Sequence, residues 1–188
     1  MNLNNDVDTK NPWVTLSSNI LYENQWIKLR KNDVITPRGD NGEYTYIDKK
    51  GAVGAVVLNS KNEIYLVGQY RYAMNEYTWE IIEGGIEEGE SYLNAIKREI
   101  KEEAGITASN YQVLMENVHI SNSVTNERGV LYLVRDVLEE GNKVPDPTEK
   151  IIVKKVPFNE VVNLVYQGKI VDLFSIAGIL LAAKELNI

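Results

Sequence analysis

Three glutamates in the middle of the chain have the spacing of a metal site built on a helix. Glu102 and Glu103 follow Glu99 by three and four residues, so a helix that turns ~100° per residue would present all three carboxylates on one face. Like charges at these spacings repel each other and weaken a helix. A divalent cation among them would remove the repulsion, and carboxylate oxygens are ligands that suit Mg²⁺ or Mn²⁺.

The residue types that the chain lacks make its carboxylates more important. Cysteine is absent, so disulfides, zinc–thiolate sites and thiol nucleophiles are excluded. The only histidine, His119, stands in an apolar segment that is predicted to be a strand, and it is expected to be a core residue. Metal binding and acid–base chemistry must therefore depend mainly on Asp and Glu.

The three glutamates lie in a segment that is predicted to be a helix from Ser91 to Ala104. Gly105 follows at the position where glycine commonly ends a helix. Apolar side chains recur at helical spacing and would form one stripe toward the core, made of Leu93, Ile96, Ile100 and Ala104. A glutamate-rich helix face alone is usually a solvated surface, so the residues around the helix have to decide its role.

The segment around this helix fits a longer pattern, G-x5-E-x7-R-E-U-x-E-E-x-G-U, where U is an aliphatic residue. At average residue usage, a random window would match its seven fixed residue types roughly once in 10⁸. The pattern is the Nudix box, and the chain therefore resembles the Nudix hydrolases. The matching residues are Gly84, Glu90, Arg98, Glu99, Ile100, Glu102, Glu103, Gly105 and Ile106.

This resemblance implies an α+β fold, an α/β/α sandwich with a mixed sheet, and hydrolysis that depends on Mg²⁺, with Mn²⁺ as the alternative cation. The expected metal ligands are three box carboxylates and the backbone carbonyl just before the box: Glu99, Glu102, Glu103 and Glu83. The expected catalytic residues within the box are Glu103, Arg98 and Glu90, with Arg98 pairing with Glu90 to hold the carboxylates in place. Clustered cations neutralise a diphosphate, orient it and make water nucleophilic near neutral pH.

Outside the box, the chain resembles the ADP-ribose pyrophosphatase branch of the family over nearly its full length. The features that carry this resemblance are Gln69-Tyr70-Arg71, the lead-in Trp79-Glu80-Ile81-Ile82-Glu83-Gly84-Gly85 and an N-terminal extension. The branch implies that Arg71 and Glu80 bind the substrate, Arg71 at its phosphates, and that Trp26 stacks on the nucleobase. The alternatives are a surface arginine at a strand end and a core tryptophan.

The same branch places a catalytic glutamate on a loop after the box. Glu149 matches it, because Glu149-Lys150-Ile151-Ile152-Val153 puts a carboxylate between Pro145-Asp146-Pro147 and a predicted strand. A base on a loop is consistent with closure on the substrate. Glu127 is the second candidate for the base, and a solvated loop residue is the alternative interpretation of Glu149.

Apolar runs and turn signals predict strands and helices that are mixed without a regular βαβ repeat. Residues 1–48 are expected to form an N-terminal β extension that dimerises and can contact the substrate, and residues 49–188 a Nudix domain. Turn residues at 37–42 and 59–62 predict two hairpins, the second in the core. A short strand is predicted at 79–82, and two helices, 159–167 and 174–186, are predicted to close the chain.

The composition limits the partners of the protein. Its 188 residues, 44% of them hydrophobic, are enough for a sizeable core, and its net charge of −7 disfavours binding to a nucleic-acid backbone. The first eleven residues lack the apolar run of a signal peptide, and no apolar stretch is long enough to cross a membrane. A cytoplasmic homodimer that acts on a small molecule is expected.

The expected reaction is hydrolysis of a nucleoside diphosphate sugar, with ADP-ribose giving AMP and ribose 5-phosphate. ADP-ribose enzymes usually have a proline downstream of the box, where this chain has Ser121-Asn122-Ser123-Val124-Thr125. GDP-mannose, other nucleotide sugars and dinucleoside polyphosphates therefore stay open as substrates. A nucleotide-binding regulator without turnover is the alternative from another class, although such relatives usually lack box glutamates.

Overall fold

The computed structural model describes residues 8–139, 141 and 150–188. Contacts between residues divide the chain into two compact units. One unit consists of the chain up to Lys49 together with Ser121–Asn126, and the other consists of Lys50–Ile120 and the chain from Glu127 onward. Each unit has its own sheets.

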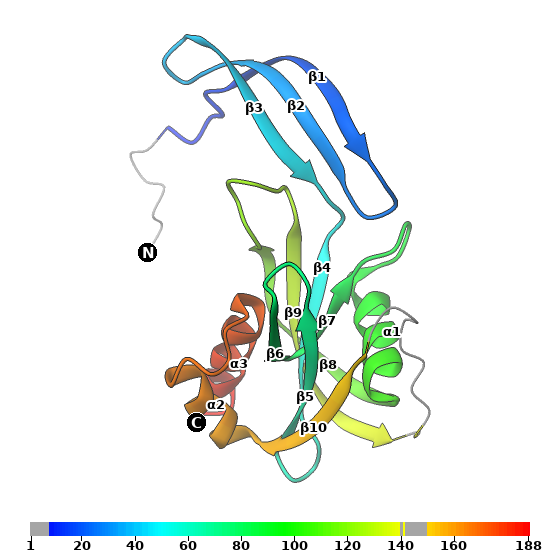
Figure 1. Ribbon diagram of the computed structural model, residues 1–188. Helices are drawn as coiled ribbons and strands as arrows, with labels where there is room; N and C mark the ends of the chain where they lie inside the picture. Colours follow the sequence, from blue (N-terminus) through cyan, green and yellow to red (C-terminus); the bar gives the residue numbers. More distant parts are fainter. Residues whose placement is uncertain (1–7, 140, 142–149) are drawn as a thin grey trace. The chain divides into compact units, whose positions relative to one another are not determined.

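An antiparallel sheet of three strands makes up most of the first unit (Figure 1). Its strands follow one another across the sheet and are β1 (Val14–Glu23), β2 (Lys28–Ile35) and β3 (Asn41–Asp48). β2 and β3 form the predicted hairpin, in whose turn Gly39 is left-handed with a φ of 89°. Asn126 attaches the distant segment to this sheet, because its side-chain amide donates to Asp48 at 2.7 Å.

Two sheets form the centre of the second unit. The first has the order β7-β4-β9-β8, with β4 parallel to β9 and the other neighbours antiparallel. The second has the order β10-β5-β6 and is antiparallel. The strands are β4 (Ala52–Val57), β5 (Glu63–Arg71), β6 (Glu76–Glu80), β7 (Ile82–Gly85), β8 (Ile106–His119), β9 (Arg128–Glu139) and β10 (Ile152–Pro157).

Two predictions about these strands are wrong. β4 and β5 do not form a hairpin beyond a single bridge between Leu58 and Ile64, because β7 and β9 already occupy both edges of β4. The predicted strand at 79–82 is a junction between two strands, since β6 ends at Glu80 and β7 begins at Ile82. The chain therefore passes from one sheet to the other at Ile81.

Helices cover both sides of these sheets (Figure 1). α1 (Tyr92–Ala104) lies on one side, and α2 (Phe158–Tyr166) and α3 (Leu173–Glu185) lie on the other. Alternate residues of the central strands enter two separate cores: Val56 and Leu131 pack with α2 and α3, whereas Val57 and Val130 pack with α1. These layers are the expected α/β/α sandwich. In the described part of the chain, no helix is long and apolar enough to cross a membrane.

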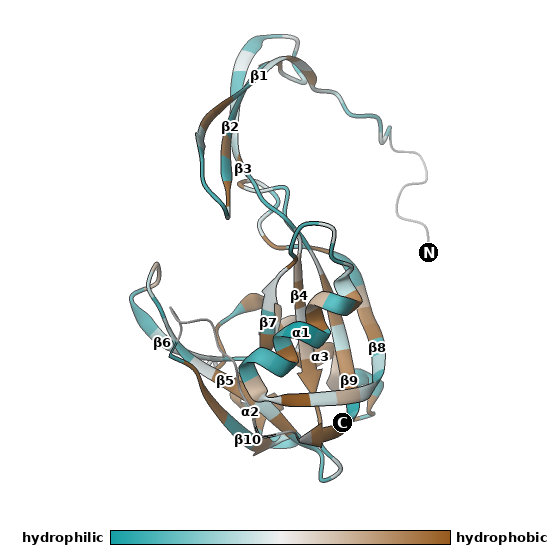
Figure 2. Ribbon diagram, turned by 90° about the vertical axis from the view of Figure 1, so that its right-hand side faces the viewer, coloured by the Kyte–Doolittle hydropathy of each residue, from teal (hydrophilic) through white to brown (hydrophobic). Residues whose placement is uncertain are grey.

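α1 has the predicted limits. Ser91 caps its start by accepting a hydrogen bond from Asn94 N–H at 3.2 Å, and Gly105, with a φ of 69°, ends it. One detail of the predicted apolar stripe is wrong, because Leu93 is 39% exposed whereas Glu103 is only 5% exposed. The packed side of the helix is therefore turned toward Glu103, and its outer side is hydrophilic (Figure 2).

Candidate active site

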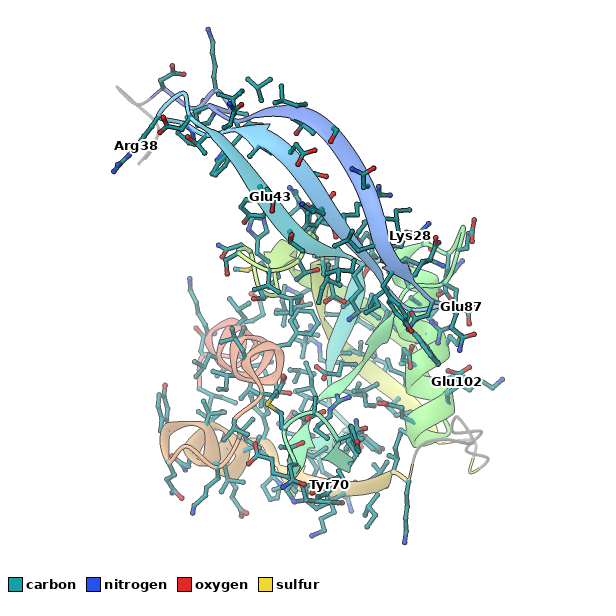
Figure 3. All side chains as sticks on the ribbon, turned by 45° about the horizontal axis from the view of Figure 1, so that its top comes forward. Lys28, Arg38, Glu43, Tyr70, Glu87 and Glu102 are labelled. Carbon is teal, nitrogen blue, oxygen red and sulfur yellow. The ribbon has the colours of Figure 1, made fainter. Side chains whose placement is uncertain are left out.

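Arg98 is the centre of an ion-pair network on the box helix. Its Nε and Nη2 donate to the two carboxylate oxygens of Glu90 at 3.1 and 3.0 Å, which makes a bidentate pair. Its Nη1 donates to Glu99 at 2.7 Å and to Glu102 at 3.1 Å, and its Nη2 donates to the carbonyl of Gly85 at 2.9 Å. Arg98 therefore ties the loop before α1 to two box carboxylates, of which Glu102 is labelled in Figure 3.

This network keeps Arg98 and Glu90 charged. The hydrogen bonds from Arg98 hold the pKa of Glu90 below its ordinary value, although partial burial acts in the opposite direction. Glu90, and after it Glu99 and Glu102, raise the already high pKa of Arg98. An arginine that cannot lose its proton and is fixed by its pair with Glu90 forms a rigid support on which Glu99 and Glu102 are oriented.

Gly84 lets the lead-in strand pass directly against the carboxylate of Glu99. A Cβ atom at Gly84 would overlap this carboxylate, whereas a Cβ atom at Gly85 would meet nothing within 4 Å. A larger residue at position 84 would therefore displace the Glu99 carboxylate or the lead-in backbone. The approach places the backbone that follows Glu83 beside the box carboxylates.

The donor atoms gathered here fit a hard divalent cation. Glu99, Glu102, Glu103 and the backbone of the lead-in offer oxygen ligands, which Mg²⁺ prefers. In the side-chain arrangement of the described residues, no group of three acidic or histidine side chains surrounds a common ion position. The Arg98 guanidinium binds both Glu99 and Glu102 in this arrangement. Arg98 holds one oxygen of each carboxylate, Oε1 of Glu99 and Oε2 of Glu102.

A second ion cluster joins the ends of β5 and β6 to the lead-in. Arg71 Nε donates to both oxygens of Glu80 at 3.0 Å, and Arg71 Nη2 donates to Glu80 at 2.5 Å and to Glu83 at 2.7 Å. Glu80 also accepts from the hydroxyl of Thr78 at 2.6 Å and from the amide of Gln69 at 3.5 Å. The Glu80 side chain is 3% exposed and the Arg71 side chain 37%. Arg71 therefore reaches the surface, and Glu80 does not.

α3 holds the junction between β6 and β7, where this cluster is built. Ile81 N–H donates to the hydroxyl of Ser175 at 3.0 Å, and Ser175 is fully buried. Asp172 caps α3 by accepting from Ser175 N–H at 2.6 Å. Sequence analysis missed this contact because Ser175 is 94 residues downstream of Ile81. The only local signal was the capping spacing between Asp172 and Ser175.

Glu83 links the two clusters, and its pKa is shifted in the opposite direction from that of Glu90. Burial, together with the nearby carboxylates of Asp172 and Glu80, holds the pKa of Glu83 well above its ordinary value, and Arg71 opposes this shift. Oε1 of Glu83 accepts from Arg71, and Oε2 is buried without a hydrogen bond to any described residue. Because Gly84 follows directly, both clusters share one stretch of backbone.

The other residues singled out from the sequence differ in how far they are exposed to solvent. Trp26 belongs to the first unit and is 68% exposed, so it is not a core tryptophan. His119 is exposed as well, contrary to prediction, because it ends an edge strand whose register shifts between Met115 and Val118. Glu127 is 7% exposed and stands directly before β9. Glu149 lies outside the described residues.

Comparison with known protein families agrees with this geometry. Residues 48–172 match the model of the NUDIX domain. This chain belongs to the Nudix family. Residues 13–47 match the model of the nucleoside diphosphate sugar hydrolase N-terminal domain. The protein is therefore a Nudix pyrophosphohydrolase, a class of enzyme that generally uses a divalent metal and acts on small nucleotide substrates.

Relatives of this Nudix hydrolase include proteins with different described roles. It is 29% identical over 168 residues to the ADP-ribose pyrophosphatase of Mycobacterium tuberculosis, covering 88% of this chain and 81% of that protein. It is 24% identical over 159 residues to the methanol dehydrogenase activator of Bacillus methanolicus, covering 84% and 85%. A crystal structure of an ADP compounds hydrolase matches with a TM-score of 0.81 at 16% identity, covering 96% of this chain and 97% of that chain. This last likeness confirms the fold.

Proposed function

We propose that this Nudix hydrolase cleaves the diphosphate bond of a nucleoside diphosphate sugar, and that ADP-ribose is its preferred substrate. The products would be AMP and ribose 5-phosphate. The observation that carries this proposal is that Glu83 binds Arg71 while the next residue, Gly84, lies against Glu99. An arginine with a permanent charge, joined in this way to carboxylates that can hold a cation, suits a ligand with two neighbouring phosphates. The relative named ADP-ribose pyrophosphatase supports the choice of substrate.

The proposed cation is Mg²⁺, which Mn²⁺ could replace. Bound by the carboxylates of Glu99, Glu102 and Glu103 and by the carbonyl of Glu83, it would neutralise the diphosphate and lower the pKa of a water molecule. Arg98, fixed by its bidentate pair with Glu90, orients Glu99 and Glu102 through hydrogen bonds. Arg71 binds a substrate phosphate with the part of its guanidinium that reaches the surface.

The proposed general base is Glu149, with Glu127 as the second candidate. Sequence resemblance supports Glu149, and topology supports Glu127. Ala52 of β4 pairs with Gly85 on one side and with Gly129 on the other, so Glu127 stands at the end of the sheet that carries the lead-in. The burial of Glu127 disfavours this second candidate, because it limits the access of its carboxylate to water.

The N-terminal residues 1–48 are proposed to dimerise, and residues 49–188 to form the catalytic domain. β1 is an edge strand, and Val14, Leu16 and Ile20 on it are 55%, 58% and 46% exposed. An edge strand with exposed apolar side chains is stable in solution when another surface covers it, and a second copy of the chain is the proposed partner. In that dimer Trp26, which is exposed, would stack on the nucleobase of the substrate.

A panel of nucleotide sugars and dinucleoside polyphosphates, assayed with Mg²⁺ and with excess EDTA, tests the proposed function. We expect ADP-ribose to have the highest kcat/KM and every activity to disappear in EDTA. Faster turnover of GDP-mannose or of a dinucleoside polyphosphate would correct the substrate and keep the chemistry. Tight nucleotide binding without turnover of any compound would instead identify a binding regulator.

A further inference from the structure

We propose that Glu80 is a positioning residue that aims Arg71 at the substrate, and that it does not contact the substrate itself. This inference rests on the proposed function, since it concerns the arginine that binds the substrate phosphate. It replaces the expectation from sequence that Glu80 is a substrate ligand.

The burial of Glu80 is the first observation. Its side chain is 3% exposed, and both of its carboxylate oxygens accept hydrogen bonds from within the protein. Oε1 accepts from Arg71 and from the hydroxyl of Thr78, and Oε2 accepts from Arg71 and from the amide of Gln69. A phosphate would be repelled by this carboxylate and would find no donor on it.

The hydrogen bonds of Arg71 are the second observation. A guanidinium has five N–H donors in a planar fork. Nε of Arg71 donates to Glu80, and Nη2 divides its donors between Glu80 and Glu83. Nη1 donates to none of the described residues, and the side chain is 37% exposed. The two glutamates therefore fix one edge of the guanidinium plane and leave the Nη1 donors for a ligand.

Supports beneath Glu80 are the third observation. Thr78 is buried, and its hydroxyl lies 2.6 Å from Glu80 Oε1. Ile81, the next residue, is held to α3 by the Ser175 hydroxyl at 3.0 Å. The backbone on either side of the Glu80 carboxylate is thus anchored, by pairing of β6 with β5 on one side and by α3 on the other. A charged, anchored carboxylate can hold a flexible arginine in one direction.

A double-mutant cycle on ADP-ribose hydrolysis tests this role. Glu80→Gln is expected to lower kcat/KM by about tenfold or more when Arg71 is present, the loss typical of a charge-assisted hydrogen-bond pair. In an Arg71→Met background, the same change should have little further effect, because Glu80 would have nothing to aim. An equal loss in both backgrounds would overturn the proposal. If Arg71→Met does not fold, Arg71→Gln provides the second background, since glutamine also leaves Glu80 without a cation to aim.

The matched control is Glu76→Gln. Glu76 is on the same strand, β6, pairs directly with Arg71 across the ladder, and is exposed. The substitution removes the same charge from the same neighbourhood, so a general electrostatic effect would appear in both variants. We expect Glu76→Gln to change kcat/KM by less than about twofold, as is usual for an exposed charge. A loss equal to that of Glu80→Gln would overturn the proposal.

A spectroscopic readout separates this inference from the proposed function. The Arg71 Nε–H signal in ¹⁵N-resolved NMR spectra of the substrate-free protein should be protected from exchange with water, because it donates to Glu80 at 3.0 Å. Protection should be lost in Glu80→Gln, reduced in Thr78→Val and kept in Glu76→Gln. Unchanged protection in Glu80→Gln would refute the positioning role, even if ADP-ribose is the substrate. If the wild type hydrolyses no nucleotide sugar, the proposed function fails, and the NMR result still decides the role of Glu80.

Discussion

At the scale of single residues, the contact between Gly84 and Glu99 can be tested by adding one methyl group. A Cβ at position 84 would overlap the Glu99 carboxylate, so Gly84→Ala must displace either the lead-in backbone or Glu99. Displacements of about 1 Å near a reacting centre can cost about 10²-fold in rate. We expect a loss of this size in kcat/KM for Gly84→Ala, measured with saturating Mg²⁺.

Gly85→Ala is the control for this substitution, because a Cβ there would meet nothing within 4 Å. It should keep most of the activity, and both variants should unfold at temperatures close to that of the wild type. Equal activity in the two alanine variants would show that the close approach at Gly84 is not needed for catalysis.

The identity of the general base is also decided at single residues. Glu149→Gln should lower kcat by at least about a hundredfold with little change in KM, since general-base assistance is worth about 10²–10⁴-fold and acts in the transition state. Glu127→Gln should lose far less. Steady-state kinetics on both variants measure the difference. If the order of the two losses is reversed, the base is Glu127.

The Arg98–Glu90 pair makes the folded protein lose stability as the pH falls into the acidic range. Arg98 lowers the pKa of Glu90 in the folded protein, so ionised Glu90 stabilises the fold above the unfolded pKa of ~4.3. This contribution is lost as the pH falls through the lower folded pKa. We therefore expect wild type to be more stable than Glu90→Gln at neutral pH, with the difference shrinking below pH ~4.

Urea unfolding of the metal-free protein measures this difference. Glu88→Gln is the matched control, because the Glu88 side chain is 95% exposed and lies in the same loop before α1. It should show no comparable dependence on pH. A stability gap between wild type and Glu90→Gln that stays constant from neutral to acidic pH would contradict the assigned role of Arg98.

At the scale of elements, α3 fixes the crossing between the two sheets. Ser175 is fully buried and its hydroxyl accepts the Ile81 N–H. Ser175→Ala leaves that N–H buried without this partner, which typically costs about 1–3 kcal/mol. We expect chemical denaturation to show this loss of unfolding free energy. Ser60→Ala, in the exposed turn between β4 and β5, is the control and should change stability little.

The same variant also tests the link from element to site. Ile81 stands between Glu80 and the β7 strand that leads to Glu83, so loosening this junction should weaken the hold of both glutamates on Arg71. We expect Ser175→Ala to lose activity together with stability. A variant that is destabilised but fully active would show that the junction supports the fold alone.

At the scale of the whole molecule, the proposed homodimer depends on the N-terminal sheet. Among residues 8–49, Val34 is the only buried residue, so this sheet has almost no core of its own. We expect sedimentation at micromolar concentration to show a dimer. Replacing Leu16 and Ile20 by lysine should produce monomers and lower activity, because charged side chains on an edge strand prevent pairing.

Val113→Lys is the control for this experiment. Val113 is 45% exposed on β8, which is the edge strand of the mixed sheet. The variant should remain a dimer. Monomeric wild type would refute the dimer and the proposed role of Trp26, and monomers formed by Val113→Lys would move the interface to β8.

The chemistry of the box helix was determined by the sequence itself, because its determinants are local. Helical spacing decides that Glu99 and Glu102 share a face, and Ser91 and Gly105 fix the ends of the helix through hydrogen bonds and backbone conformation within a few residues. The apolar runs likewise predicted most of the strands. None of these inferences required knowing which segments meet in space.

The tertiary structure alone decided how the site is supported. Arg71 meets Glu80 and Glu83 across a strand pairing and a change of sheet, and Ile81 meets Ser175 across 94 residues. Periodicity tells which side chains share a face, but it does not tell which strands pair, as the separation of β4 from β5 shows. Strand partners, and with them the exposure of His119 and the burial of Glu80, are fixed by how all segments pack together.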